Sequence, residues 1–387
     1  MNYISFSPHF PANYYHFSVQ LHNLGVNVLG LGDVWFDSLR SELKSALTEY
    51  YRVNNAQNYD ELVRAMGYFI YRYGKIDRLE SHNEFWLESD ARLRTDFNIP
   101  GFHVDDLARI KRKSEMKKMF QAAGIRTARG KVIDSYNEAR TFINKVGYPL
   151  VAKPDIGVGA STTYKISNDT DLKAFFDRKP GVEYIFEEYI QGIIQTFDGL
   201  VDQDGKVVFS SSLQYSNGMM DLVNQNLDFF YYSQRIIPED LDKAGRKLTA
   251  LYGLKERFFH FEFFRTDDNS LVGLEVNMRP PGGLTTDMFN YANDINIYRE
   301  YANIVMKNHF EADVTRPYFC AYISRRNNRE YIHQHSDIMT RYAGNIAHHE
   351  QIPGAFSAAL GDYGYLIRSP YFEEIKQMAE WILDKNT

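Results

Sequence analysis

The sequence has 387 residues, of which 44% are hydrophobic and 24% are charged, a composition typical of a globular protein with an apolar core. This length predicts two or three domains, and the net charge of −6 without a long basic run argues against nucleic acid as a partner. Cys320 is the single cysteine, which excludes an intramolecular disulfide framework. With no signal-peptide pattern and no apolar run of about 18 residues, we expect a cytoplasmic protein that does not enter a membrane.

The first part of the chain predicts a parallel sheet, because strand and helix patterns alternate with short connections as in a βαβ unit. The expected elements are a strand at residues 2–7, a helix at 15–24 and a buried strand at 26–32. Residues 80–99 then have a helical pattern that stops at Pro100–Gly101. We therefore assign residues 1–107 to an N-terminal α/β domain.

The next part, residues 108–190, predicts a compact α+β unit. It opens with an amphipathic helix at residues 114–123, whose apolar side chains recur every three to four residues. The further expected elements are strands at residues 129–133, 148–154, 162–166 and 183–190, and helices at 136–146 and 169–178.

Residues 191–310 predict an antiparallel sheet with helices, and Asp204–Gly205 is a strong signal for a hairpin turn within it. The last segment, residues 311–387, mixes short strands with a terminal helix at residues 371–384. We treat this segment as a C-terminal extension.

Residues 259–283 predict a β-hairpin with one polar and one apolar face. The first strand carries His260, Glu262 and Phe264 on one face, and Phe259, Phe261 and Phe263 on the other. The second strand carries Gly273, Glu275 and Asn277 on one face, and Val272, Leu274 and Val276 on the other. A two-residue turn at Asp268–Asn269 sets Glu262 opposite Glu275 and His260 opposite Asn277.

Two carboxylates that face each other across a sheet need a counter-charge, because like charges in this arrangement are destabilising. A hard divalent cation with oxygen ligands supplies one, and Mg²⁺ shared with substrate phosphates is the usual case. Glu262, Glu275 and Asn277 are therefore the candidate metal ligands. The alternative is a solvated hairpin face with two surface glutamates.

Lys153 ends a strand and precedes a loop that contains glycines and small hydroxyl residues. Glycines at 157 and 159 allow the backbone to approach a ligand closely, and backbone N–H groups with hydroxyls bind phosphate oxygens. The loop residues that fit this role are Gly157, Gly159, Ser161 and Thr162. The alternative is an ordinary hairpin loop.

Two further segments have weaker signals. Lys113 stands at a helix start, where a lysine opposes the helix dipole unless an anion compensates it. Residues 185–192, IFEEYIQG, predict an edge strand whose free backbone offers hydrogen bonds to a flat heterocycle. A solvated lysine and an ordinary strand end are the structural alternatives.

The histidines at 333, 335, 348 and 349 resemble metal ligands in their spacing, but we interpret them as surface or core residues because no cysteine or HExxH pattern accompanies them.

Arg325 and Arg326 are candidates for a clamp on a substrate carboxylate, with a solvated strand end as the alternative.

Taken in chain order, these motifs closely resemble those of the ATP-grasp superfamily over roughly residues 75–300. The matching features are Lys113 followed by a helix and Ala123–Gly124–Ile125, Lys153 with its glycine loop, the segment EEYI, and the hairpin with Glu275, Asn277 and Arg279. Four ordered motifs are far more specific than any one of them. The resemblance is to the amino-acid ligase and carbamoyl-phosphate-synthase-like branches with a single ATP-grasp unit.

The resemblance implies a role for each position. Lys113 and Lys153 contact ATP phosphates, a loop at residues 155–163 closes over them, and Glu262, Glu275 and Asn277 hold one or two Mg²⁺ ions, with Mn²⁺ as an alternative. Arg279 stabilises the transferring phosphoryl group, with Lys153 as a second catalytic residue. The adenine site is formed by Glu187, Glu188, Tyr189 and Ile190, with the backbone of Glu188 and Ile190 binding the base.

The implied fold is ATP-grasp, α/β and α+β: a pre-ATP-grasp domain at residues 1–107, a lid at 108–190, a central antiparallel sheet with the metal site at 191–310, and an extension at 311–387. The implied reaction is ATP-dependent ligation of a small-molecule carboxylate and an amine through an acyl phosphate, giving ADP and phosphate. A small-molecule kinase and a non-catalytic nucleotide-binding module are the alternatives, and a homodimer is plausible.

One segment departs from the family pattern. Members often carry an acidic residue after the EEYI segment that binds the ribose hydroxyls, whereas this chain has Ile193 and Ile194 there. Either Gln195 or another side chain takes that role, or the ribose is held loosely.

Overall fold

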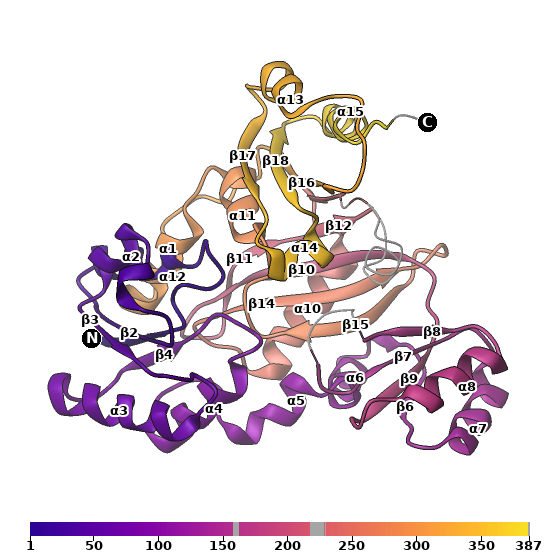
Figure 1. The fold of residues 1–387 in the computed structure, drawn as a ribbon, viewed down its shortest axis with the longest axis horizontal. Coiled ribbons are helices and arrows are strands. Elements are labelled where there is room, and N and C mark those ends of the chain that lie inside the picture. Colours follow the sequence, from indigo (N-terminus) through magenta and orange to yellow (C-terminus); the bar gives the residue numbers. More distant parts are fainter. Residues whose placement is uncertain (158–161, 217–227, 229, 386–387) are drawn as a thin grey trace.

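A computed structural model describes residues 1–157, 162–216, 228 and 230–385. Three β-sheets organise the chain, and Figure 1 shows the N-terminal sheet on the left, a small sheet at lower right and the C-terminal strands at the top, around a large central sheet. None of the helices among the described residues is long and apolar enough to cross a membrane.

The N-terminal sheet has four strands in the order β3-β2-β1-β4, and all its pairings are parallel, as the βαβ pattern predicts. Its strands are β1 (Asn2–Phe6), β2 (Asn27–Gly32), β3 (Glu49–Arg52) and β4 (Arg78–Glu80), and its helices are α1 (Tyr15–Asn23), α2 (Ser41–Ala46), α3 (Tyr59–Tyr73) and α4 (Leu87–Asp96). The predicted helix at residues 80–99 is too long, because its first residue belongs to β4 and the helix begins at Leu87.

The small sheet has the order β6-β9-β7-β8 and is antiparallel throughout. Its strands are β6 (Gly130–Val132), β7 (Leu150–Pro154), β8 (Tyr164–Ile166) and β9 (Tyr184–Glu188), with helices α7 (Tyr136–Val146) and α8 (Asp169–Arg178). Helices α5 (Leu107–Lys111) and α6 (Lys113–Ala122) precede it. Strand β9 pairs with β6 and β7, so the expectation of an edge strand at residues 185–192 is wrong.

The large sheet has ten strands, all antiparallel except for β5, which runs parallel to β15. Its strands are β5 (Arg126–Thr127), β10 (Ile193–Val201), β11 (Val207–Ser211), β12 (Leu213–Tyr215), β13 (Phe230–Ser233), β14 (Arg257–Arg265), β15 (Leu271–Asn277), β16 (Phe319–Arg325), β17 (Ile346–Gln351) and β18 (Tyr363–Ser369). Strands of the predicted C-terminal extension thus continue the central sheet. The predicted domain boundaries themselves remain predictions.

Helices cover both sides of the large sheet. They are α10 (Glu239–Tyr252), α11 (Thr285–Asn293), α12 (Ile297–Lys307), α13 (His335–Arg341), α14 (Gly354–Leu360) and α15 (Phe372–Ile382). Phe259, Phe261 and Phe263 are fully buried in a single cluster with side chains of α6 and α10, so the predicted apolar face of the hairpin is confirmed.

The hairpin of β14 and β15 has the predicted pairing of Glu262 with Glu275 and of His260 with Asn277, but its turn differs from the prediction. Thr266 and Ser270 close the turn, and Asn269 within it has a φ of 62°. The predicted two-residue turn is therefore wrong. A register shift after Glu262 compensates for the longer turn and restores the predicted pairing.

The same register shift moves Gly273 to the other face of the hairpin. Gly273 pairs with Phe263, and a Cβ atom at this position would lie 2.4 Å from Phe120 Cδ1 in the apolar cluster. The prediction that Gly273 shares a face with Glu275 and Asn277 is therefore wrong. An extra residue in one strand inverts the alternation beyond it.

Helix α10 packs on β10 at a glycine, and this contact yields a stability prediction. A Cβ atom at Gly245 would lie 1.9 Å from Phe197 Cδ1, so we expect Gly245→Ala to lower the free energy of unfolding by about 1–3 kcal/mol. Gly67 in α3 is the matched control, because it is exposed and a Cβ atom there meets nothing within 4 Å. Gly67→Ala should raise the free energy of unfolding by about 0.5–1 kcal/mol. Urea denaturation measures both, and equal stability of Gly245→Ala and wild type would contradict the packing.

Candidate active site

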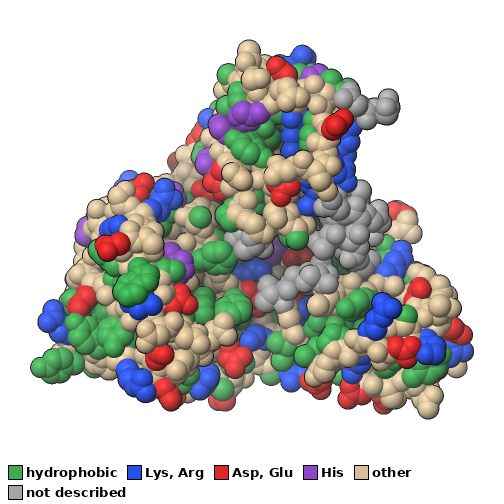
Figure 2. Space-filling view, in the orientation of Figure 1, with side chains coloured by type: hydrophobic (Ala, Val, Ile, Leu, Met, Phe, Trp, Pro, Cys, Tyr) green, Lys and Arg blue, Asp and Glu red, His purple; other side chains and the backbone are tan. Residues whose placement is uncertain are grey.

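The polar face of the β14–β15 hairpin meets the start of α6 and the strands of the small sheet. On the face seen in Figure 2, the surface is hollowed between the N-terminal part, the small sheet and the C-terminal part of the chain. The chain brings together residues from positions 84 to 279 here, and the contacts among them define a candidate active site.

Glu262 and Glu275 face each other on this hairpin, and each carboxylate has a separate cationic partner. The Nζ atom of Lys113 lies 3.0 Å from Glu275 Oε1. The Nε2 atom of His260 lies 3.0 Å from Glu262 Oε1. Lys113 and His260 thus provide the counter-charges that we expected for the two carboxylates.

His260 is held between two carboxylates inside the sheet. Its Nδ1 atom lies 2.6 Å from Asp198 Oδ1 on the neighbouring strand β10. Burial lowers the pKa of the imidazole, but Asp198 and Glu262 outweigh burial and raise it to about 9. Burial raises the pKa of Glu262, and the contact with His260 outweighs it, so that the pKa of Glu262 is lowered. His260 and Glu262 therefore form a charged pair near neutral pH, whereas burial raises the pKa of Asp198.

The donor set of the hairpin fits a hard divalent cation. Glu262, Glu275 and Asn277 offer two carboxylates and one amide oxygen from one face, and oxygen ligands of this kind suit Mg²⁺. Among the described residues, no three His, Cys, Asp or Glu side chains gather in a way that could hold a metal ion. Asn277 would therefore have to serve as the third protein ligand.

Lys113 joins the hairpin to the loop after β7. Its Nζ atom also donates a hydrogen bond to Gly157 O, at 3.0 Å. Asp155 Oδ1 accepts a hydrogen bond from Ser114 N at 2.8 Å, and Asp155 O accepts one from Lys113 N at 2.9 Å. An anionic side chain thus caps α6 and compensates the lysine at its start. Sequence reasoning missed this role of Asp155.

Lys153 belongs to a buried triad with one carboxylate and a second lysine. Glu187 Oε2 lies 2.8 Å from Lys153 Nζ, and Glu187 Oε1 lies 2.6 Å from Lys117 Nζ. All three side chains are at least 90% buried. Burial lowers the pKa of Lys117, whereas Glu187 and Glu275 outweigh burial and raise the pKa of Lys153. One carboxylate thus bridges two buried lysines.

Lys117 was not among the predicted site residues. The available signal was its spacing of four residues from Lys113, which puts both lysines on one face of α6. The adjacent Lys118 lies on the exposed face of α6, and its side chain is 67% accessible.

Arg279 lies just beyond β15 and contacts the N-terminal part of the chain. Its Nε atom lies 3.3 Å from Glu84 Oε2, and its Nη1 atom donates to Pro280 O. Burial raises the pKa of Glu84, although Arg279 opposes this. Glu84 was not among the predicted site residues, because it lies almost 200 residues away within a segment that was interpreted as a helix.

The predicted phosphate loop and base-binding segment are described only in part. Gly157 and Thr162 flank the loop, whereas Gly159 and Ser161 lie outside the described residues.

In the predicted base-binding segment, Glu188 forms an ion pair with Arg129 at 2.5 Å, and its backbone N–H donates to Arg129 O. The N–H of Tyr189 donates to Pro149 O, and its ring lies 4.3 Å from Lys165 Nζ. Ile190 follows the end of β9.

Ile193 and Ile194, at the position where the family pattern has an acidic residue, belong to strand β10 of the large sheet. Ile193 is 47% exposed, whereas Ile194 is buried in β10. Gln195, the candidate substitute, donates to Gln214 Oε1 and accepts from Arg265 Nε. Its amide is therefore held by neighbouring side chains.

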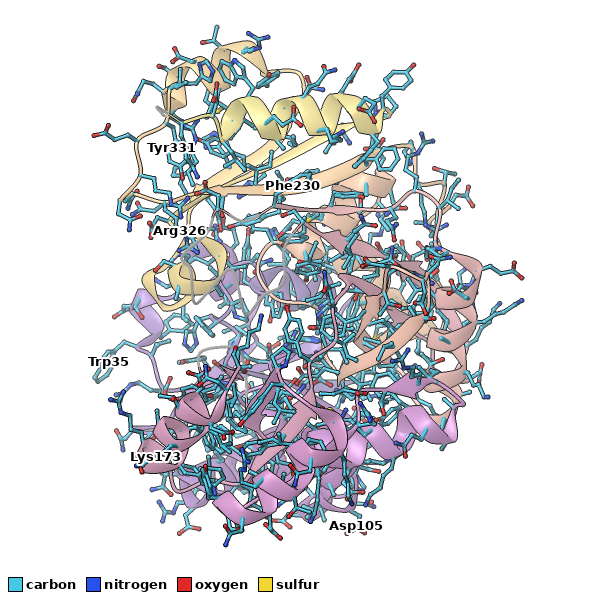
Figure 3. The ribbon with its side chains drawn as sticks, turned by 90° about the vertical axis from the view of Figure 1, so that its right-hand side faces the viewer. Trp35, Asp105, Lys173, Phe230, Arg326 and Tyr331 are labelled. Carbon is cyan, nitrogen blue, oxygen red and sulfur yellow. The ribbon has the colours of Figure 1, made fainter. Side chains whose placement is uncertain are left out.

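The C-terminal candidates have structural partners. Arg325 donates to Ile382 O and His333 O, and Arg326 donates to Ser357 O and Ala358 O at the end of α14. Figure 3 shows Arg326 and Tyr331 together in the C-terminal part, where Tyr331 OH accepts from the backbone of Arg326. Both arginines therefore bind main-chain carbonyl groups in the C-terminal part of the chain.

The histidines in this part of the chain contact aromatic or acidic side chains. His333 stacks on Trp381, His335 and His349 hydrogen-bond to tyrosine hydroxyls, and His348 pairs with Glu350.

Comparison with known proteins identifies a domain family and relatives to which this chain is similar. Residues 146–287 match the ATP-grasp domain family. The L-arginine-specific L-amino acid ligase of Bacillus subtilis is 22% identical over 244 residues, which cover 61% of this chain and 59% of that protein. The alignment thus spans less than two thirds of the length of this relative.

Solved structures agree over almost the whole chain. An L-amino acid ligase from Bacillus licheniformis has a TM-score of 0.76 at 15% identity, covering 98% of this chain and 95% of that one. N5-carboxyaminoimidazole synthetase from Staphylococcus aureus, complexed with ADP, has a TM-score of 0.73 at 13% identity, covering 97% and 95%. The predicted ATP-grasp fold is therefore confirmed.

The triad of Lys117, Glu187 and Lys153 generates a prediction about charge. Glu187→Gln leaves two buried ammonium groups without their counter-charge, so we expect it to lower the free energy of unfolding by about 3–5 kcal/mol. Inorganic tripolyphosphate should recover part of this loss, because it supplies the missing negative charge. Thermal denaturation with and without tripolyphosphate measures both effects.

Glu188→Gln is the matched control for this experiment. Glu188 pairs with Arg129, whose side chain is 59% accessible, so the loss should be about 1 kcal/mol or less. Equal effects of the two substitutions would contradict the buried triad.

Proposed function

We propose that this chain, which has the ATP-grasp fold and carries an ATP-grasp domain at residues 146–287, is an ATP-dependent carboxylate–amine ligase. Its substrates are a small-molecule carboxylate and an amine, and its products are an amide, ADP and phosphate. The observation that carries the proposal is the ion pair between Lys113 and Glu275, which itself pairs with Glu262 across the hairpin. The buried Lys153 and Arg279, which follows the same hairpin, add two further positive charges.

The lysines are suited to bind the phosphates of ATP. Lys113 reaches the loop after β7 through Gly157 O, and Lys153 projects from the strand that precedes the same loop. Both ammonium groups are paired with carboxylates in the protein alone, so a nucleotide competes for them with Glu275 and Glu187. Phosphoryl transfer needs this kind of positioning and charge neutralisation more than a nucleophilic side chain.

Glu262, Glu275 and Asn277 are the residues that would hold Mg²⁺, with Mn²⁺ as an alternative. A divalent cation held there would supply positive charge to the phosphates of ATP. The protein contributes two opposed carboxylates whose register is set by the hairpin.

Arg279 is suited to stabilise negative charge on the transferring group. In the first step, a substrate carboxylate oxygen attacks the γ-phosphorus, an O–P bond forms, and the bond to the β-phosphate oxygen breaks to release ADP. In the second step, the amine nitrogen attacks the acyl carbon, phosphate leaves, and the nitrogen gives up a proton. The guanidinium of Arg279 lies 3.3 Å from Glu84 Oε2, and this ion pair supports a fixed position for its charge.

The proposal predicts loss of turnover when one ligand carboxylate is neutralised. Glu275→Gln should reduce ADP release with Mg²⁺-ATP and substrates at least a hundredfold, because it removes a cation ligand and the partner of Lys113. Asp268→Asn at the exposed turn of the same hairpin is the control and should keep wild-type turnover. Unchanged turnover of Glu275→Gln would rule out the assignment of this carboxylate.

The proposed intermediate gives a second prediction. With hydroxylamine in place of the amine, an acyl phosphate is converted into a hydroxamate, which mass spectrometry detects together with ADP. A matrix of amino-acid pairs and simple carboxylates identifies the substrates in the same assay. ADP release with a phosphorylated hydroxyl product and no hydroxamate would indicate a kinase instead.

A further inference from the structure

Behind the proposed metal face lies a buried chain of hydrogen bonds that the reaction described above does not use. It runs through Thr196, Asp198, His260 and Glu262. Asp198 lies directly opposite His260 in the pairing of β10 with β14, and Thr196 lies opposite Glu262. All four side chains therefore belong to two adjacent strands and share one face of the sheet.

The contacts along this chain are short and continuous. Thr196 Oγ1 donates to Asp198 Oδ2 at 2.6 Å, and Asp198 Oδ1 lies 2.6 Å from His260 Nδ1. His260 Nε2 lies 3.0 Å from Glu262 Oε1. Thr196 Oγ1 itself accepts a hydrogen bond from Leu213 N at 3.0 Å. The threonine hydroxyl is thus fixed by the backbone of β12, and each later group is oriented by the one before it.

The burial of these groups requires a reason. Thr196 and Asp198 are completely inaccessible and His260 is 4% exposed. Taking a carboxylate out of water is costly, and a hydrophobic side chain would fill this position in a sheet without that cost. A carboxylate behind a histidine is the arrangement that orients an imidazole at many metal sites, where the outer partners fix the inner ligands.

We propose that Asp198 and His260 are positioning residues that fix the carboxylate of Glu262 for a divalent cation. Asp198 holds the Nδ1 side of the imidazole, so that Nε2 is directed at Glu262 Oε1 and limits the rotation of this carboxylate. This inference rests on the proposed function, since it takes Glu262 as a ligand of the nucleotide-bound metal.

The two ligand carboxylates differ in the way they are held. Glu262 is fixed by its own sheet, through residues that contact neither the loop after β7 nor the small sheet in the hydrogen bonds of the described residues. Glu275 is held by Lys113, which also contacts Gly157 in that loop. Binding of a nucleotide therefore competes for the partner of Glu275, while the support of Glu262 stays in place.

The test measures Mn²⁺ binding by electron paramagnetic resonance in the presence of saturating ADP. Asp198→Asn keeps the side-chain shape and removes the charge behind the imidazole, and His260→Phe keeps a ring and removes both nitrogen contacts. We expect each to weaken Mn²⁺ binding about 10- to 100-fold. Binding of ADP without metal should stay within about twofold of wild type, and turnover should recover when the Mn²⁺ concentration is raised in proportion.

The chain offers a matched control for the histidine substitution. His348 and Glu350 repeat the spacing of His260 and Glu262 on β17, with His348 Nε2 3.1 Å from Glu350 Oε2. His348→Phe should leave Mn²⁺ binding unchanged. A purely structural role for Asp198 and His260 predicts a lower melting temperature with unchanged Mn²⁺ affinity, and this result would overturn the inference.

Glu262→Gln separates the inference from the proposed function. If Glu262→Gln abolishes Mn²⁺ binding while Asp198→Asn and His260→Phe bind Mn²⁺ within twofold of wild type, the positioning role is refuted and the ligand assignment stands. If Glu262→Gln binds Mn²⁺ as wild type does, the ligand assignment fails and the positioning role fails with it. Should His260→Phe not fold, the nearly isosteric Asp198→Asn decides the question by the same measurement.

Discussion

The pairing of Glu262 with Glu275 on adjacent strands is the constraint on which the rest of the site depends. Two carboxylates held face to face by a backbone ladder repel each other, and each must therefore be matched by a positive charge. His260 meets one from within the sheet, and Lys113 meets the other from the start of α6. The need for these counter-charges ties the hairpin to α6 and, through α6, to the loop after β7.

The same balance of charge recurs in the small sheet. Glu187 lies between Lys117 and Lys153, so that a carboxylate separates two buried ammonium groups. Lys153, which we propose to bind phosphate, thus forms an ion pair with Glu187 in the protein alone. The pairing with Glu187 limits the cost of burying these two lysines. In the function that we propose, the nucleotide phosphates would replace Glu187 as the partner of Lys153.

The register of the hairpin was predictable, but through two errors that cancel. The predicted turn at Asp268–Asn269 is too short, and an extra residue in β15, Leu274, shifts the pairing back by one. Alternation predicted all three buried phenylalanines of β14 correctly, because the extra residue lies in β15. Only Gly273 in β15 lies on the face opposite to the predicted one. Local patterns carry no signal for this bulge, which places Gly273 against Phe120.

The sequence by itself determined the order of elements, the apolar face of the hairpin and the presence of two lysines and two opposed carboxylates, because these depend on periodicity and local spacing. Only the tertiary structure decided that Lys117 is buried while Lys118 is exposed, that Asp198 stands behind His260, and that Glu84 contacts Arg279. Those contacts join residues 62 to 195 positions apart or depend on which helix face is covered. Which charged side chains come into contact therefore depends on how elements that are distant in the sequence pack together.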